Sequence, residues 1–137
     1  MPAEKPLIVI HGGGLAGCEA AWQALNQGCR VRLIEMRPEK STEAHKTGSL
    51  CELVCSNSLK STDELSPPGL LKAEMKSFGS LILQAAQKAS VPAGHALAVD
   101  REIFSGHVQQ TLESHPDFER VSQETTALPS MEETRVV

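Results

Sequence analysis

A strand pattern, a helix pattern and a second strand pattern follow one another in the first part of the chain. Pro6–His11 is a short, mostly apolar run, as expected for a strand that is buried on both faces. Leu15–Gln27 has the apolar spacing of a helix, and Gly28 stands where a helix commonly ends. Cys29–Glu35 is a second apolar run. This order predicts a right-handed β-α-β unit with two parallel strands.

The middle of the chain alternates between loop and helix patterns. Met36–Leu50 carries alternating charges and no sustained period, so we expect a long loop that leaves the carboxyl edge of the sheet. Pro67–Gly69 predicts a break, after which Leu70–Ser90 has the apolar spacing of one amphipathic helix that ends at Val91–Gly94. The stripe that we expect in the core consists of Leu71, Met75, Phe78, Ile82, Ala85 and Ala89.

One more helix and two strands are predicted in the last part. Asp100 follows the short apolar segment Ala96–Val99 and is placed to cap a helix, which His115-Pro116 stops. The buried face of this helix would carry Ile103, Phe104, Val108 and Leu112. Phe118–Leu128 suggests a strand with a polar exposed face, and Thr134–Val137 suggests the start of another. Because a globular protein rarely ends inside a core strand, we expect the chain to be a truncated part of a longer protein.

Composition and charge limit the classes of function. A chain of 137 residues with 40% hydrophobic residues can form one domain with a core, although aromatic residues are scarce at 3%. The formal net charge of −4 gives no basic footprint, so any RNA contact must be local or made by another part. No apolar run approaches the length of a membrane span, and the first residues lack a signal-peptide core. We therefore expect a cytoplasmic protein without membrane contact.

The turn after the first strand carries the pattern G-x-G-x-x-G at Gly12, Gly14 and Gly17. Gly12 would permit the tight turn, Gly14 the approach of a pyrophosphate, and Gly17 the close packing of the helix against the strand. The N–H groups at the start of the helix would face the phosphates. Glu35 lies 18 residues after Gly17, where it would accept hydrogen bonds from an adenosine ribose. These features predict a dinucleotide site without distinguishing FAD from NAD.

The four cysteines show no C-x-x-C motif, so we expect free thiols. Cys18 in the helix and Cys29 at the start of the second strand are expected to serve packing. Cys51 and Cys55 are spaced as two metal ligands one helical turn apart would be. No further ligands stand at the spacing of a zinc finger, so we expect no metal.

Cys55 stands beside small hydrogen-bonding side chains, Ser56 and Asn57, directly after the long loop, where it would lie over a flavin ring. With its surroundings, this motif resembles the folate-dependent tRNA uridine-5-methyltransferase flavoproteins, the TrmFO family. The resemblance runs from Leu7 to about Leu128. Its segments are Gly-Gly-Gly-Leu-Ala-Gly-Cys-Glu-Ala-Ala-Trp (12–22), Arg-Leu-Ile-Glu-Met-Arg-Pro (32–38), Leu-Val-Cys-Ser-Asn-Ser-Leu (53–59), Gly-Leu-Leu-Lys-Ala-Glu-Met (69–75) and Val-Pro-Ala-Gly-His-Ala-Leu-Ala-Val-Asp-Arg (91–101). Only the first of these is common to many flavoproteins.

The resemblance implies an α/β fold with a parallel sheet, namely a Rossmann-like FAD-binding domain of the glutathione-reductase type. Residues 1–137 would be the N-terminal part of that domain, with the remainder of the enzyme absent. The implied reaction is methylation of carbon 5 of a T-loop uridine in tRNA. Methylenetetrahydrofolate would be the carbon donor, FAD the carrier and NAD(P)H the reductant of the flavin. The remainder would supply the folate pocket and most tRNA contacts, so we expect this chain alone to be inactive.

The resemblance also implies roles for individual residues. Cys55 would be a catalytic thiol that adds to an electron-poor ring and leaves again, and a second catalytic cysteine would lie beyond Val137. The residues expected to contact FAD are Gly12, Gly13, Gly14, Leu15, Ala16, Gly17, Glu35, Arg37, Ser56 and Asn57. Cys51 and His95 depart from the family pattern and inherit no role.

Three other functions remain open. Flavoprotein disulfide reductases carry a cysteine pair after their second strand, but with four intervening residues rather than the three between Cys51 and Cys55. A sister flavoprotein that modifies the wobble uridine of tRNA shares the nucleotide fold, although the segment Leu53–Ser58 argues for the methyltransferase. The non-enzyme alternative is an inert nucleotide-binding fragment.

Overall fold

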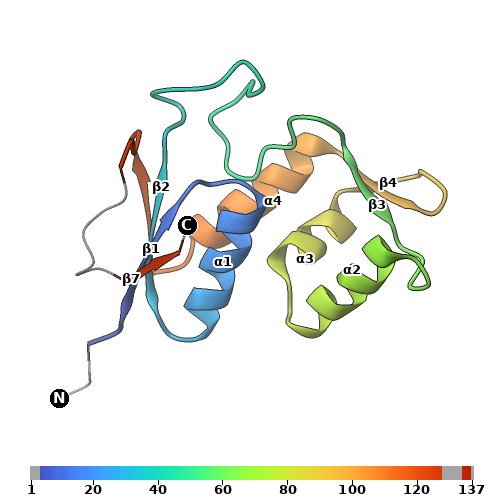
Figure 1. The fold of residues 1–137 in the computed structure, drawn as a ribbon, viewed down its shortest axis with the longest axis horizontal. Coiled ribbons are helices and arrows are strands. Elements are labelled where there is room, and N and C mark those ends of the chain that lie inside the picture. The colour runs from blue at the N-terminus through green and yellow to red at the C-terminus, as the bar shows by residue number, and fades with distance from the viewer. Residues whose placement is uncertain (1–3, 128–133, 137) are drawn as a thin grey trace.

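The computed structural model describes residues 4–127 and 134–136. Its elements, in chain order, are β1 (Leu7–His11), α1 (Leu15–Asn26), β2 (Arg30–Glu35), β3 (Ser58–Ser61), α2 (Pro67–Ser77), α3 (Leu81–Lys88), β4 (Ser90–Val91), β5 (Ala96–Val99), α4 (Arg101–Glu113), β6 (Phe118–Ser122) and β7 (Thr134–Val136). The strands form a parallel sheet, in the order β6-β2-β1-β7, and an antiparallel sheet, in the order β3-β5-β4. Helices α1 and α4 lie against one face of the parallel sheet, and α2 and α3 lie beyond them (Figure 1).

The parallel sheet confirms the predicted α/β fold with its β-α-β start. β1 pairs with β2 in the register Ile8↔Val31 and Ile10↔Leu33, so alternate apolar residues of both strands face the same helices. The chain adds β2 and β6 on one side of β1 and returns to add β7 on the other side. The strand order therefore reverses at β1, and its carboxyl end is the switch point where open α/β sheets bind ligands.

The core lies between the parallel sheet and its helices. Ile10 and Leu33 of the sheet are at most 1% exposed. On α4, three residues at four-residue steps are 0% exposed: Phe104, Val108 and Leu112. Burying each such side chain stabilises the fold by roughly 1.5–3 kcal/mol. Asp100 caps α4 as predicted, by accepting two backbone N–H bonds of 3.0 Å. The prediction that Ile103 is buried is wrong, because it is 56% exposed.

The single helix predicted for Leu70–Ser90 is wrong, because the structure has two helices, α2 and α3, in its place. The break lies at Gly79, whose φ of +67° is left-handed, and Ser80 then caps α3 with its side chain. Pro67–Gly69 is not a break, since it forms the first turn of α2 after the capping residue Ser66. Proline is accepted there because the first N–H groups of a helix have no partner within the helix.

This break divides the apolar stripe that the sequence places in the core. Ile82, Ala85 and Ala89 are at most 6% exposed, so the prediction is confirmed for them. It is wrong for Leu71 and Phe78, which are 56% and 75% exposed. α2 therefore turns apolar side chains outward.

The antiparallel sheet has no counterpart in the sequence predictions. Where Val91–Gly94 was expected to end a helix, Ser90 and Val91 form β4, which pairs with β5. Asn57, the residue before β3, is hydrogen-bonded to Val99 of β5. Its backbone oxygen accepts the Val99 N–H at 2.9 Å, and its Nδ2 donates to the Val99 oxygen at 3.1 Å. Strands of two to four residues show too little alternation to be recognised.

The C-terminal strands are shorter than predicted where they can be compared. β6 ends at Ser122, whereas the predicted strand was Phe118–Leu128, and Leu128 lies outside the described residues. β7 falls within the predicted Thr134–Val137, whose last residue also lies outside them. In the described part of the chain, no helix is long and apolar enough to cross a membrane.

Two glycines of the G-x-G-x-x-G motif, Gly14 just before α1 and Gly17 in its first turn, should respond in opposite ways to alanine. A Cβ at Gly17 would lie 1.8 Å from the backbone oxygen of Gly12, so Gly17→Ala should lower the free energy of unfolding by about 3 kcal/mol or more. A Cβ at Gly14 meets nothing within 4 Å, so Gly14→Ala should leave stability unchanged or raise it by roughly 0.4–1 kcal/mol. Urea unfolding measures both, and equal losses would contradict this account of the turn.

Candidate functional site

The glycine turn lies at the carboxyl end of β1, where the topology places a ligand. Gly12 has a φ of +101°, and its N–H donates to the Ile34 oxygen at 2.8 Å. The missing side chain of Gly17 lets α1 begin directly against Gly12. The steric roles predicted for these two glycines are therefore confirmed, while Gly14 faces open space as a pyrophosphate would require.

The N-terminus of α1 is built differently from those of the other helices. Gly14 precedes α1 without any side-chain acceptor, and the first turn holds no acidic residue. The other three helices that the structure describes are each capped by a serine or aspartate side chain. The first N–H groups of an uncapped helix, at the positive end of its dipole, are suited to an anion.

Gly13, between the two glycines of the motif, is held from three directions. Its N–H donates to Glu35 Oε2 at 2.8 Å. Its carbonyl oxygen accepts the Cys51 N–H at 2.7 Å and the Cys18 thiol at 3.4 Å. A Cβ at Gly13 would lie 2.5 Å from Leu50 Cδ2, so any side chain there would have to displace the buried Leu50. β2, α1 and the long loop thus fix the same peptide.

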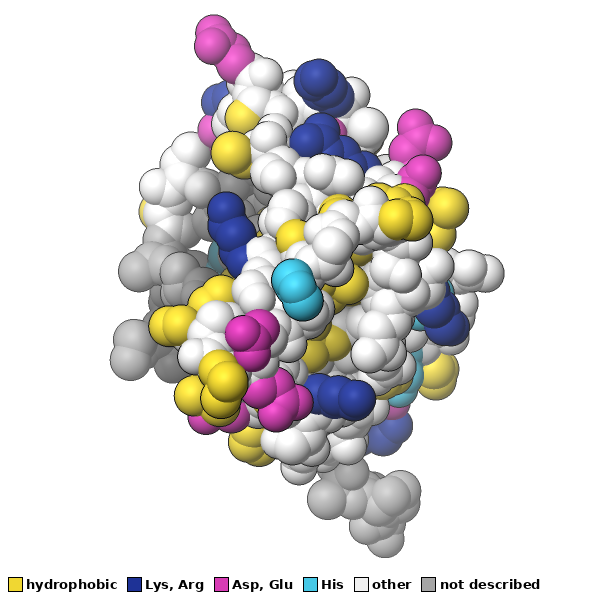
Figure 2. Space-filling view, turned by 90° about the vertical axis from the view of Figure 1, so that its right-hand side faces the viewer, with side chains coloured by type: hydrophobic (Ala, Val, Ile, Leu, Met, Phe, Trp, Pro, Cys, Tyr) yellow, Lys and Arg dark blue, Asp and Glu magenta, His cyan; other side chains and the backbone are white. Residues whose placement is uncertain are grey.

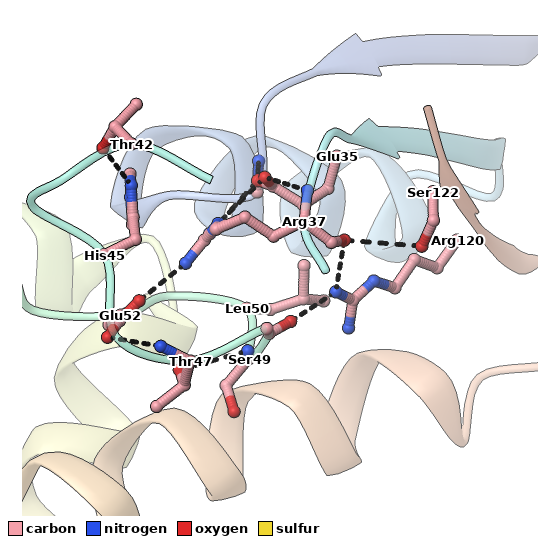
Figure 3. Close-up of polar contacts among 12 residues, drawn as sticks. Glu35, Arg37, Thr42, His45, Thr47, Ser49, Leu50, Glu52, Arg120 and Ser122 are labelled. Atoms are coloured by element: carbon pink, nitrogen blue, oxygen red, sulfur yellow. Dashed lines mark hydrogen bonds and ion pairs between the residues drawn. The ribbon is translucent and has the colours of Figure 1, made fainter. Parts of the chain in front are cut away.

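Glu35 and Arg37 form a buried ion pair beside the turn (Figure 3). Arg37 donates to Glu35 Oε1 through Nε at 2.9 Å and its backbone N–H at 3.0 Å, and to Oε2 through Nη2 at 3.2 Å. Its Nη1 donates to Glu52 Oε2 at 2.9 Å, so one guanidinium joins two carboxylates. With the Gly13 N–H, the Glu35 oxygens accept four hydrogen bonds, which fills the lone-pair sites of a carboxylate.

The contacts of this network keep its groups charged. Burial acts to raise the pKa of Glu35, but the hydrogen bonds from Arg37 and Gly13 outweigh it and lower the pKa from 4.5 to about 2. The pKa of Glu52 is also lowered, because two loop N–H groups and the Arg37 charge outweigh desolvation. The same carboxylates raise the pKa of Arg37 against the effect of burial.

Arg120 in β6 fixes the loop that carries Arg37. Its Nη2 donates to the carbonyl oxygens of Arg37 at 3.2 Å and Gly48 at 2.5 Å (Figure 3). Both ends of the loop Met36–Leu50 are thereby tied to β6. Sequence reasoning missed Arg120, which stands alone in a strand without a motif. It also missed Glu52, whose only signal was its place beside the cysteine motif.

A cavity of about 440 Å³ lies above these residues, within the size range of small-molecule sites. Its walls are the glycine turn, the end of β2 with Arg37, and residues 123–125 after β6. His11, the last residue of β1, also lines it. Both ring nitrogens of His11 are buried, and among the described residues neither has a hydrogen-bond partner. A ligand in the cavity is one source of the missing partner.

The Cys55 motif does not line this cavity. Cys55 is exposed on a turn before β3. Ser56 and Asn57 use their side chains within this turn and toward β5, at 3.0 and 3.1 Å. A second cavity, of about 470 Å³, is lined by the two residues before Cys55 and by the first turns of α4. Glu52 lines both cavities, so the two lie side by side.

Cys18 and Cys51 pack beneath the glycine turn, and both are 0% exposed. The pKa of the Cys51 thiol is raised, first by its hydrogen bond with Cys18 and then by burial. A thiol in this state stays protonated and unreactive. With Cys55 exposed and Cys51 sealed in the core, the arrangement does not favour the reactive pair of a disulfide reductase.

Comparison with known proteins gives the family. The family model described as "Glucose inhibited division protein A" matches residues 6–137. The chain belongs to this family. Proteins named methylenetetrahydrofolate–tRNA-(uracil-5-)-methyltransferase TrmFO are similar to it. That of Aquifex aeolicus (strain VF5) is 52% identical over 128 residues, or 93% of this chain, and that of Koribacter versatilis (strain Ellin345) is 55% identical over 130 residues, or 95%. The resemblance to TrmFO is thus confirmed.

The chain spans 29% of the length of each of these two relatives. A solved structure titled "Crystal structure of MHPCO, Y270F mutant" covers 85% of this chain and 32% of its own, with a TM-score of 0.48 and 15% sequence identity. A likeness as distant as this one supports no inference about function.

The Glu35 ion pair should make the fold sensitive to acid. Because the folded-state pKa of about 2 lies below 4.5, the contribution is complete above pH 4.5 and is lost as the pH falls toward 2. It amounts to roughly 3 kcal/mol. We expect Glu35→Gln to lower the free energy of unfolding at pH 7 by about this amount and to flatten its fall below pH 5, as measured by urea unfolding.

The matched control for this prediction is Glu119→Gln. Glu119 forms an exposed ion pair with Arg32, so the change should cost less than about 1 kcal/mol. A Glu35→Gln variant with the acid profile of the unaltered chain would show that the pair does not set acid stability.

Proposed function

We propose that this chain is the N-terminal part of the FAD-binding domain of a methylenetetrahydrofolate–tRNA-(uracil-5-)-methyltransferase. The observation that carries the proposal is its identity of 52% and 55% to two TrmFO proteins over a region that includes both the glycine turn and the Cys55 motif. Since that region is 29% of each relative, the reaction, its folate and its tRNA are assigned to a protein of the relatives' length.

The residues around the 440 Å³ cavity fit the adenosine half of FAD. The pyrophosphate would lie on Gly12–Gly14, where no side chain stands in its way, and accept hydrogen bonds from the N–H groups of Leu15 and Ala16. The buried nitrogens of His11 would gain a partner in the same cavity. Three independent features of the cavity thus suit an anionic ligand with hydrogen-bonding groups.

Glu35 would bind the ribose by exchanging one of its present hydrogen bonds, because its four acceptor sites are in use. The bond from Arg37 Nη2, at 3.2 Å, is the longest of the four and is the one that a ribose hydroxyl would replace. Arg37 would keep its 2.9 Å bonds to Glu35 and Glu52, so the buried charges would remain paired. Arg37 would then orient Glu35 toward the ribose.

Cys55 is the residue of this chain that would act on the uridine. FAD, when bound, would supply the redox chemistry of carbon transfer, with methylenetetrahydrofolate as donor and NAD(P)H as reductant. The Cys55 thiol is exposed on a turn anchored through Asn57, so an electron-poor ring can reach it, and there it would add to the ring and leave again. Ser56, in the same turn, would contact the flavin.

The rest of a relative-length protein would hold most of the tRNA. This chain has a net charge of −4, and binding of a nucleic-acid backbone depends on lysine and arginine contacts. A cytoplasmic location, where tRNA is modified, stays a prediction for the same protein.

Loss of the cofactor without loss of the fold tests the FAD site. Gly14→Val places a branched side chain where the pyrophosphate must approach, and should reduce binding of FAD, and of ADP as its adenosine half, by at least about a hundredfold. Calorimetric titration measures the affinities, and circular dichroism checks the fold. Gln27→Val, at the exposed far end of α1, is the control and should bind as the unaltered chain does. Equal binding by both variants would contradict the assignment.

A chimeric protein can test whether Cys55 acts in the reaction while Cys51 serves only packing. In it, this chain replaces the matching 29% of the Aquifex aeolicus relative. Cys55→Ala should reduce methyl transfer to a T-loop uridine on the order of a thousandfold or more at equal flavin content. Cys51→Ala should keep most activity, because Cys51 holds the turn through its backbone N–H. If Cys55→Ala kept its activity and Cys51→Ala lost it, the catalytic role would belong to Cys51 instead of Cys55.

A further inference from the structure

Helix α2 exposes the side that its sequence pattern marks as apolar. Leu71, Met75 and Phe78 follow one another at steps of four and three, as residues on one face of a helix do. Nevertheless Leu71 is 56% and Phe78 75% exposed. Figure 2 views the molecule from the side of β3, β4 and α2, where hydrophobic side chains come to the surface between charged ones. Apolar residues at this spacing mark the face of a helix that packs against another surface. The described residues leave Leu71 and Phe78 largely exposed, while Met75 between them is half-buried.

The stripe borders a groove between α1 and α2. One part of the groove has a volume of about 490 Å³ and is walled by Leu15 and Ala20 of α1, Leu59 of β3, and Leu71 and Met75 of α2. It continues into a hollow of about 250 Å³ at Met75 and the exposed Phe78, and both parts share Met75. The groove therefore runs along most of α2.

The polar groups at the groove already have partners. Glu19 accepts the Ser80 hydroxyl at 2.6 Å and backbone N–H groups at the start of α3 at 3.1 and 3.3 Å. Lys72 Nζ donates to the Ser61 and Pro68 oxygens, both at 3.1 Å, and burial lowers its pKa. A polar ligand or a nucleic acid would find few groups to bind here. The groove offers apolar surface, which suits aliphatic or aromatic side chains.

We propose that this groove receives an apolar segment from the part of the polypeptide that TrmFO relatives have beyond the region matched by this chain. The inference depends on the proposed function in one respect only, because it takes the remaining polypeptide of a TrmFO protein as the partner of the groove. The relatives supply the length for it, since the matched region is 29% of the Aquifex aeolicus protein. Docking there would bury Leu71 and Phe78 and turn α2 into an internal helix, as its sequence pattern predicts.

The same substitution in two settings tests the proposal. Leu71→Asp with Phe78→Asp should change the melting temperature of the isolated full chain by less than about 2 °C, because both side chains face solvent there. In the chimera with the Aquifex aeolicus relative it should lower the melting temperature by about 5 °C or more, because the charges would enter an apolar interface. Lys76→Asp, an exposed position of the same helix, should have a small effect in both settings.

Other outcomes would overturn the proposal. Equal shifts in the two settings would mean that the remaining polypeptide does not cover the groove. Sedimentation of the isolated chain as a dimer that the double substitution dissociates would make a second copy the occupant. If the chimera does not fold, the same charges at the aligned positions of the Aquifex aeolicus protein give the second measurement, with the same reading. Flavin content and methyl transfer, recorded on the same samples, report separately on the proposed function.

Discussion

The peptide of Gly13 is the point at which the chain's separate parts meet. Glu35 from β2 binds its N–H, while Cys51 from the loop and Cys18 from α1 bind its carbonyl oxygen. Leu50 fills the space where a side chain would stand. The turn is therefore rigid on its inner side and open on its outer side, toward the 440 Å³ cavity. A phosphate site needs this combination, because donors that are already aligned pay little ordering entropy on binding.

The buried charges of Glu35, Arg37 and Glu52 fix the positions of the residues around the glycine turn. Removing two carboxylates and a guanidinium from water is costly, and the cost is offset only because each charge is paired and hydrogen-bonded. The pairing is possible only when the loop after β2 places Arg37 between Glu35 and Glu52. Glu52 lies three residues before Cys55 and lines both cavities. The network thus couples the glycine turn to the position of the cysteine motif.

Part of the fold and site followed from local sequence. The strand, glycine turn and helix from Leu7 to Asn26 were predicted to within a residue or two, because glycine conformation and apolar spacing act between near neighbours. The cap by Asp100 was predictable for the same reason, because it involves only the residues that directly follow Asp100 in the chain. The helix break at Gly79 was missed because the apolar spacing continues across it, and the pattern could not reveal that Ser80 caps a new helix. The exposure of Leu71 and Phe78 was missed because periodicity marks an apolar face without saying what covers it.

The sequence by itself determined the β-α-β start, the open glycine turn and the family to which the chain belongs. Only the tertiary structure decided that Arg37 joins Glu35 to Glu52, that Cys51 supports Gly13, and that Arg120 holds the loop in place. Arg37 and Arg120 are 83 positions apart, and Gly13 and Glu35 are 22 apart. Such contacts have no signature in the spacing of residues, because their free energy depends on where folding brings distant side chains and on how completely it removes them from water.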